Sequence, residues 1–195
     1  YNYLYRLNCG GDDYTDSFGQ LWLQDNTNYS RSWAENFKDL NPYLASQRTT
    51  NDPIRGTRDW TLFQHFRFGR HQLEYRFPVT DGTYRIELYF TEPWHGTGGS
   101  ASTDCEGLRI FNVAVNDSVV LDDLDIWAES GHDGVCKKVV YATVKSGMLK
   151  IHFPEVKAGQ ALISGIAIAS TDQELKPTIF LASDWSWEKA EDRKS

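Results

Sequence analysis

Apolar and polar residues alternate with a period of two along much of this chain, and this pattern constrains the fold most. Successive side chains of a β-strand point to opposite faces, so the alternation predicts strands with one buried face. The alternating stretches are residues 3–9, 72–77, 84–90, 108–115, 139–144, 149–153 and 162–169. Gly, Asn and Asp turn signals punctuate them at 81–82, 116–118, 146–147 and 158–159. Many short strands joined by such turns predict an all-β sandwich of the jelly-roll type.

The chain has 195 residues, enough for one domain with a substantial core. We expect that domain to span residues 1–170, and we expect the charged segment 171–195 to be a linker towards a neighbouring domain. Tyr1 is not an initiator methionine, so we expect the chain to be cut from a longer protein. Three regions do not fit a strand pattern: residues 10–59, 92–107 and 122–134. Within the first, residues 32–40 could form one or two helical turns. Long loops of this kind usually carry function.

Charge and composition exclude several kinds of partner. The net charge of −7 argues against nucleic acid, which needs a basic surface, and against docking on anionic membranes. No run of 18 apolar residues is present, so we expect no membrane insertion. Aromatic residues make up 14% of the chain and include seven Trp. A domain of this size has little use for so many Trp in its interior, so we expect some to be exposed for binding.

The three cysteines are Cys9, Cys105 and Cys136, and none belongs to a C-x-x-C pair. A zinc site is therefore not expected. Cys9 falls in an alternating stretch and is predicted to be a buried thiol. Cys105 and Cys136 lie in polar, loop-like sequence and could form one disulfide, which would suit an exported protein, but spacing alone leaves their pairing open.

A Trp-His pair follows the strand predicted to end at Thr91. Pro93 fixes the exit from the strand, and the glycines after His95 cannot continue it, so Trp94 is expected at a rim. An indole there could lie flat on the apolar face of a sugar ring. By analogy with bases stacked on aromatic side chains, such a contact is worth about 1–3 kcal/mol. The alternative is that Trp94 folds back as a lid on the core, because Trp is usually well buried.

A second candidate region is the aromatic and basic stretch from Phe63 to His71. Alternation places residues 63, 65, 67 and 69 on one face and residues 64, 66, 68 and 70 on the other. Phe68 and Arg70, which flank Gly69, are candidates for a binding edge. The alternative is an ordinary division into core and surface positions.

Carboxylates are concentrated between Asp122 and Asp133, which raises the question of catalysis or metal binding. The spacing matches no EF-hand, and Asp and His also shape turns by accepting backbone N–H bonds, which is the reading we favour. We expect no cofactor, with a structural calcium ion left open. The sequence holds no G-x-S-x-G, phosphate-loop, dinucleotide-binding or H-E-x-x-H pattern, so catalysis is not expected. An enzyme using Glu92 or Asp123 with His132 is the minor alternative.

Six short motifs follow one another across the domain. They are N-C-G-G at 8–11, then Asp16, Gly19, Trp22 and Asp25, L-F-Q with R-F at 62–68, F-T-E at 90–92, F-N-V-A-V-N at 111–116, and D-L-D-I with G-H between 123 and 132. Over residues 6–169 this series resembles the malectin family, including the malectin-like carbohydrate-binding modules attached to bacterial glycoside hydrolases. The resemblance implies a galactose-binding-domain-like jelly roll without catalytic activity.

The resemblance also implies a carbohydrate site. In the family, aromatic residues on loops hold a glucose-type disaccharide; the family's tyrosine falls on Phe68 and its aromatic pair on Trp94 and His95. A sugar-binding aspartate of the family falls near residues 155–158, where Glu155 is the carboxylate, and residues 43–58 do not align with the family's first tyrosine. Phe68 lacks the hydroxyl and the pair has become Trp-His. We therefore expect stacking to be kept and the hydrogen-bonding pattern to differ.

The candidate carbohydrate-binding residues are thus Phe68, Trp94, His95, Arg70 and Glu155. The sequence predicts a lectin-like module that binds an oligo- or polysaccharide, without catalysis. The insertion at 96–107 resembles modules of glycoside hydrolase family two, so we expect a polysaccharide-degrading parent enzyme exported to the periplasm, the cell surface or the medium. The alternative is a structural module that packs against the parent's catalytic domain and binds no sugar.

Overall fold

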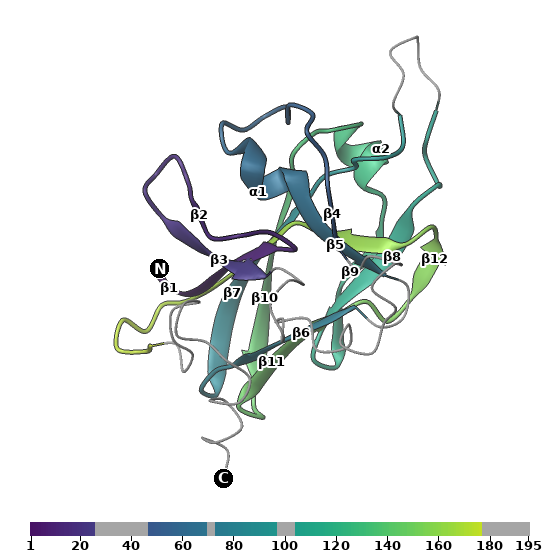
Figure 1. The fold of residues 1–195 in the computed structure, drawn as a ribbon. Helices are drawn as coiled ribbons and strands as arrows, with labels where there is room; N and C mark the ends of the chain where they lie inside the picture. The colour runs from purple at the N-terminus through teal and green to yellow at the C-terminus, as the bar shows by residue number, and fades with distance from the viewer. Residues whose placement is uncertain (26–46, 70–72, 97–103, 177–195) are drawn as a thin grey trace.

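The described part of the computed structural model, residues 1–25, 47–69, 73–96 and 104–176, is an all-β sandwich (Figure 1). The larger sheet has the order β10 (Cys136–Val144), β7 (Gly82–Phe90), β14 (Gly165–Ser170), β1 (Asn2–Cys9), β3 (Leu21–Asp25) and β2 (Tyr14–Thr15). The facing sheet consists of β12 (Val156–Ala158), β8 (Ile110–Val115), β11 (Met148–His152) and β6 (Glu74–Pro78), with β9 (Ser118–Leu124) paired to β8. A small sheet joins β13 (Ala161–Ile163), β5 (His65–Gly69) and β4 (Gln47–Thr49). The predicted fold class is confirmed.

The main hydrophobic core fills the space between the two large sheets. Alternate residues of facing strands supply it, such as Ile86, Leu88 and Phe90 of β7 and Phe111 and Val113 of β8. All five are fully buried. Each such side chain stabilises the fold by about 1.5–3 kcal/mol relative to leaving it in water. This is why the period of two in the sequence located these strands.

A second cluster covers the outer face of the larger sheet. Trp22, Ile54, Leu62 and Phe63 pack there around Ala167 of β14. Two of them belong to the short helix α1 (Trp60–Gln64), which the alternation did not predict. As a result β14 is buried on both faces, and the segment that precedes β5 is fixed against the sandwich.

A buried ion pair holds β5 against β3. Arg67 and Asp25 are both fully buried, and the Arg67 Nε to Asp25 Oδ2 distance is 2.6 Å. The Tyr75 hydroxyl (2.7 Å) and the Gly10 N–H (3.1 Å) also donate to that oxygen. Burial raises the pKa of the Tyr75 phenol and of the nearby Cys9 thiol, and the Asp25 carboxylate raises both further, so both stay neutral.

Residues 10–59 contain more regular structure than the sequence predicted. Strands β2, β3 and β4 fall within this region, and the turn between β2 and β3 is shaped by Asp16. The Asp16 carboxylate accepts bonds from the backbone N–H groups of Phe18 and Gln20 and from the Trp22 indole, while Gly19 has a φ of 79°. Polar hydrogen bonds, and not an alternation of apolar and polar residues, fix this turn. This explains why the sequence did not predict β2 and β3.

The residues after β14 and the three cysteines test further predictions from the sequence. Asn2 donates from its side-chain amide to the carbonyls of Asp172 (3.0 Å) and Leu175 (2.8 Å), so the described start of segment 171–195 lies against the first residue of β1. The rest of that segment and the helical turns expected at 32–40 lie outside the described residues. Cys9 is a fully buried thiol, as predicted. Cys105 and Cys136 are buried thiols, and no disulfide joins this described pair.

Glu87 gives the fold a specific dependence on pH. It is nearly fully buried on β7, where it pairs with Lys137 (2.7 Å) and accepts bonds from Tyr89 (2.9 Å) and Tyr3. Burial alone would raise the pKa of Glu87, but the bonds from Lys137, Tyr3 and Tyr89 outweigh it and hold the pKa at about 2. Because the folded pKa lies below the unfolded one, the ionised carboxylate stabilises the fold above the unfolded pKa, and this contribution is lost as the pH falls towards 2.

Between about pH 5 and pH 2 the unaltered protein loses unfolding free energy as Glu87 becomes protonated. We expect this loss to be smaller by roughly 2 kcal/mol in Glu87→Gln. Urea unfolding of the two proteins across this range measures the difference. Glu174→Gln, which changes an exposed carboxylate on the described end of the chain, is the control. An equal acid-induced loss in the Glu87→Gln protein and the unaltered protein would contradict the assignment.

Candidate functional site

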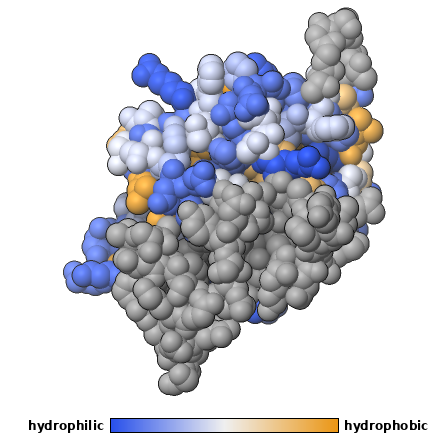
Figure 2. All heavy atoms as spheres, viewed as in Figure 1, coloured by the Kyte–Doolittle hydropathy of each residue, from blue (hydrophilic) through white to orange (hydrophobic). Residues whose placement is uncertain are grey.

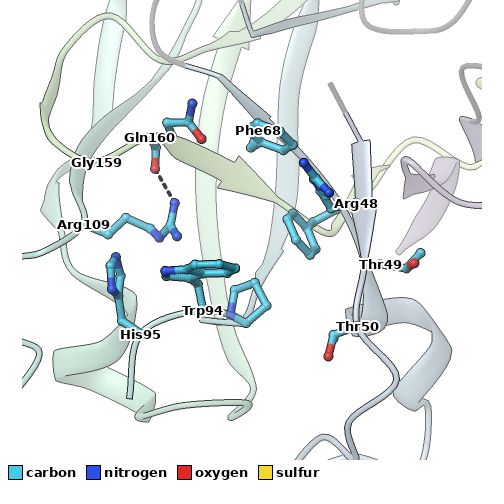
Figure 3. A pocket seen from close by; sticks show the side chains of 11 residues that line it. Arg48, Thr49, Thr50, Phe68, Trp94, His95, Arg109, Gly159 and Gln160 are labelled. Atoms are coloured by element: carbon cyan, nitrogen blue, oxygen red, sulfur yellow. Dashed lines mark hydrogen bonds between the residues drawn. The ribbon is translucent and has the colours of Figure 1, made fainter. Parts of the chain in front are cut away.

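A pocket of about 750 Å³ opens beside the small sheet, and five separate stretches of the chain form its walls. Small-ligand sites commonly have volumes of this order. One wall comes from β4 and β5, a second from the loop after β7, and a third from Arg109, which directly precedes β8, and the turn between β12 and β13 (Figure 3). Its lining residues are Arg48, Thr49, Thr50, Phe66, Phe68, Pro93, Trp94, His95, Arg109, Gly159 and Gln160.

Three of the predicted site residues, Phe68, Trp94 and His95, line this pocket together. Phe68 lies on the β5 side and Trp94 and His95 lie on the β7 loop (Figure 3). Trp94 is 74% exposed, so it is not folded back as a lid on the core. Phe68 is half-buried and packs against Phe66, with ring centroids 6.3 Å apart. The pocket therefore has the exposed ring of Trp94 on one wall and the ring of Phe68, packed against Phe66, on another.

The structure does not bring the other two predicted residues to the pocket. Arg70 lies outside the described residues. Glu155 is exposed, and its contacts are with Asn112: its carbonyl accepts the Asn112 N–H at 2.8 Å and its Oε2 accepts the amide at 3.5 Å. Glu155 is absent from the described lining of the pocket. A role in sugar binding for either residue stays a prediction.

Glu92 and Arg109 hold the loop that presents Trp94. Glu92 is fully buried, and its Oε1 accepts a bond of 2.6 Å from Arg109 Nε. Its Oε2 accepts the backbone N–H groups of Trp94 (3.1 Å) and His95 (3.3 Å). Arg109 in turn donates to the Gln160 carbonyl at 2.7 Å, the bond drawn in Figure 3. One buried ion pair thus connects two walls of the pocket and fixes the turn at its rim.

Sequence reasoning missed Arg48, Thr49, Thr50, Arg109 and Gln160 as pocket residues. Arg109 occupies a position in a predicted strand where a charged residue is expected to point to solvent, yet it is buried. Its one available signal was the F-T-E motif, because a buried glutamate after a strand requires a cationic partner. The residues of β4 lie in a region without strand alternation, and no local pattern connected them with Trp94.

Asp52, His132 and Asp133 form a cluster behind the same loop. His132 Nδ1 lies 3.0 Å from the His95 carbonyl, while its Nε2 lies 2.8 Å from Asp133 and 3.7 Å from Asp52. Burial and the Asp52 carboxylate raise the pKa of Asp133 to about 6, against the opposing charges of His132 and Arg55. Potential ligand atoms of the three residues lie within 4.8 Å of one another, so they could hold a metal ion.

Asp123 and Asp125, two other carboxylates of 122–133, have structural contacts. Asp125 caps the helix α2 (Ile126–Ser130) by accepting the Ala128 N–H at 3.1 Å, and it also accepts the Gly107 N–H at 2.7 Å. Asp123 pairs with Lys157 on the surface and has a φ of 53°. These contacts agree with the turn-forming role favoured from the sequence. Glu92, which was named with Asp123 as a carboxylate of the catalytic alternative, has both oxygens occupied by Arg109 and the loop.

Known proteins resemble this chain in sequence. The family model for the malectin domain matches residues 3–175. Malectin of Danio rerio is 25% identical over 150 residues, covering 76% of this chain and 47% of that protein; malectin of Mus musculus is 25% identical over 149 residues, covering 76% and 45%. The chain thus spans about half the length of these relatives. Within the described residues, no helix is long and apolar enough to cross a membrane.

Solved structures share the fold. A β-glucuronidase of Bacteroides uniformis superposes with a TM-score of 0.67 at 24% identity, covering 86% of this chain and 18% of that one. The ANX2 ectodomain of Arabidopsis thaliana superposes with a TM-score of 0.64 at 17% identity, covering 90% and 52%. At these identities the likeness establishes the fold and leaves function to be argued from the site.

Proposed function

This chain belongs to the malectin domain family, and on that premise we propose that it is a non-catalytic module that binds an oligo- or polysaccharide at the Trp94 pocket. The malectin domain is a carbohydrate-binding module, not a catalytic one. The observation that carries the proposal for this chain is the Trp94 ring, 74% exposed at the rim of a pocket whose opposite wall holds Phe68. An exposed indole fixed on an ordered loop is suited to stacking on a sugar.

Binding would combine stacking with a few directed hydrogen bonds. The indole would cover the C–H face of a pyranose, while hydroxyl-rich edges would meet Thr49, Thr50, His95 and the Gln160 side chain. Such open sites bind weakly, and we expect a Kd of roughly 10 μM to 1 mM, which corresponds to about −4 to −7 kcal/mol. Specificity would then come from the polar rim, because stacking tolerates many sugars.

Trp94→Ala is expected to lower glycan affinity about 5- to 150-fold, the equivalent of about 1–3 kcal/mol of lost stacking. The measurement is calorimetric titration with a glycan found on an array. Phe18→Ala is the matched control, since Phe18 is an 84% exposed aromatic residue that does not line the pocket. If a sugar binds and Trp94→Ala leaves its affinity unchanged, this pocket is not the site.

We also propose that the module is appended to an exported polysaccharide-degrading glycoside hydrolase, in the periplasm, at the cell surface or in the medium. A similar domain forms 18% of the Bacteroides uniformis β-glucuronidase chain, which supports this context. The module would keep the catalytic domain near its glycan by raising the effective concentration. The sequences that flank this chain in its parent protein test the proposal directly.

Binding by stacking requires no metal ion, so we expect glycan affinity to change less than about twofold when EDTA is added or removed. The physical reason is that the pocket's recognition groups are aromatic rings, hydroxyls and amides, whose interactions need no cation. Calorimetry with and without the chelator measures this. A large loss of affinity would instead indicate a cation at Asp52, His132 and Asp133, next to the His95 carbonyl.

The second candidate function is an interaction module that packs against the parent's catalytic domain. It is favoured by exposed Tyr1, Val139 and Tyr141, of which the last two lie on the edge strand β10. On the face seen in Figure 2, however, hydrophobic residues of the described chain form small patches among hydrophilic ones. A module that binds the isolated catalytic domain and loses that binding on Tyr141→Lys, but binds no glycan, would favour this candidate.

A further inference from the structure

The pocket differs in charge from the rest of the protein. The chain carries a net charge of −7, yet the described residues that line the pocket include two arginines and neither Asp nor Glu. A local positive region on an acidic protein concentrates the field that an anionic ligand experiences. The described lining of the pocket therefore contrasts with the net negative charge of the chain.

The two arginines are not equivalent. Arg109 is nearly buried, and both oxygens of Glu92 accept bonds from its guanidinium, so its charge is compensated inside the fold. Arg48 is exposed on β4, opposite Phe66 in the β5 register. Among the described carboxylates, none forms an ion pair with Arg48. Within the described residues its guanidinium is therefore not neutralised by a carboxylate, and it faces the pocket alongside Phe68 (Figure 3).

We propose that the glycan bound at this pocket carries a carboxylate, as a uronic acid does, and that Arg48 binds this group while Trp94 stacks on the sugar ring. The inference rests on the proposed glycan-binding function and adds the class of sugar. A planar guanidinium fork matches a carboxylate through two parallel hydrogen bonds, and such charge-assisted bonds are stronger than neutral ones. Arg48 and Trp94 lie on different walls, so one sugar residue could meet both.

The test uses acidic oligosaccharides and their neutral counterparts. Oligogalacturonate, glucuronate-bearing xylan oligosaccharides and hyaluronan fragments are titrated into the protein before and after carboxyl reduction, which converts each carboxylate to CH₂OH and leaves the linkages intact. At least one acidic probe is expected to bind about 10- to 100-fold more tightly than its reduced form, as for a charge-assisted hydrogen bond. Added salt should weaken only the acidic form.

Variants assign the preference to Arg48. Arg48→Gln is expected to abolish the difference between acidic and reduced probes while keeping the affinity for the reduced one, and Arg48→Lys to keep part of it. Arg76→Gln is the control, because Arg76 is half exposed on β6, away from the pocket, and pairs with Glu74. Reduced probes that bind as tightly as acidic ones, or a preference that survives Arg48→Gln, would overturn the inference and leave glycan binding in place. Failure of every acidic and neutral glycan to bind the folded protein would overturn both proposals.

Discussion

Asp25→Ala is expected to lower the free energy of unfolding by about 3–5 kcal/mol. The substitution removes the carboxylate that compensates Arg67, whose side chain is fully buried. It also removes the acceptor of the Tyr75 hydroxyl and of the Gly10 N–H. A buried charge that loses its counter-charge costs far more than the intact pair contributes, because the guanidinium has no water to solvate it.

Urea unfolding measures this effect, and Lys157→Ala provides the matched control. Lys157 pairs with Asp123 on the surface, where both side chains are substantially exposed, so its loss should cost less than about 1 kcal/mol. The double variant Asp25→Leu with Arg67→Met should recover part of the stability, since it removes both charges together. A loss below about 1 kcal/mol for Asp25→Ala would contradict the buried-pair account.

The sequence predicted the strands of the main core because burial on one face repeats every second residue. It predicted β7 and β8 well for that reason, as their inward positions are Ile, Leu, Phe and Val. It missed β3 and the role of Arg67, because a buried ion pair places charged residues at interior positions. Alternation alone cannot separate such a residue from one that faces solvent. Only the motif spacing that Asp25 and Arg67 share with a known family pointed to them.

The candidate site was predictable only in part, for a related reason. Trp94 and His95 follow a clear strand end and precede glycines, so their place at a rim could be inferred from local sequence. Arg48 and Gln160 reach the same pocket from segments more than forty residues away on either side. Their contribution depends on how β4 and the turn after β12 pack beside the β7 loop. That arrangement is tertiary and leaves no periodic trace in the sequence.

Glu92→Gln is expected to affect stability and binding together. Glutamine is nearly isosteric, so the substitution removes the charge and leaves the shape. Arg109, which is nearly buried, would lose its counter-charge, and we expect a loss of about 3 kcal/mol in unfolding free energy. Because Glu92 Oε2 also accepts the N–H groups of Trp94 and His95, the rim turn should loosen. Loss of preorganisation should then weaken glycan binding roughly tenfold.

Measurements of affinity and of stability distinguish a role of Glu92 in positioning Trp94 from a role in the stability of the whole fold. Calorimetry gives the affinity, and urea unfolding gives the stability of the same protein. Glu129→Gln is the control, since Glu129 pairs with Lys138 at the surface and its loss should change neither quantity by more than about 1 kcal/mol. Reduced stability with unchanged affinity would show that Trp94 is held by other contacts, such as the bond between His132 and the His95 carbonyl. Reduced affinity in a fully folded protein would show that the buried pair positions the stacking ring.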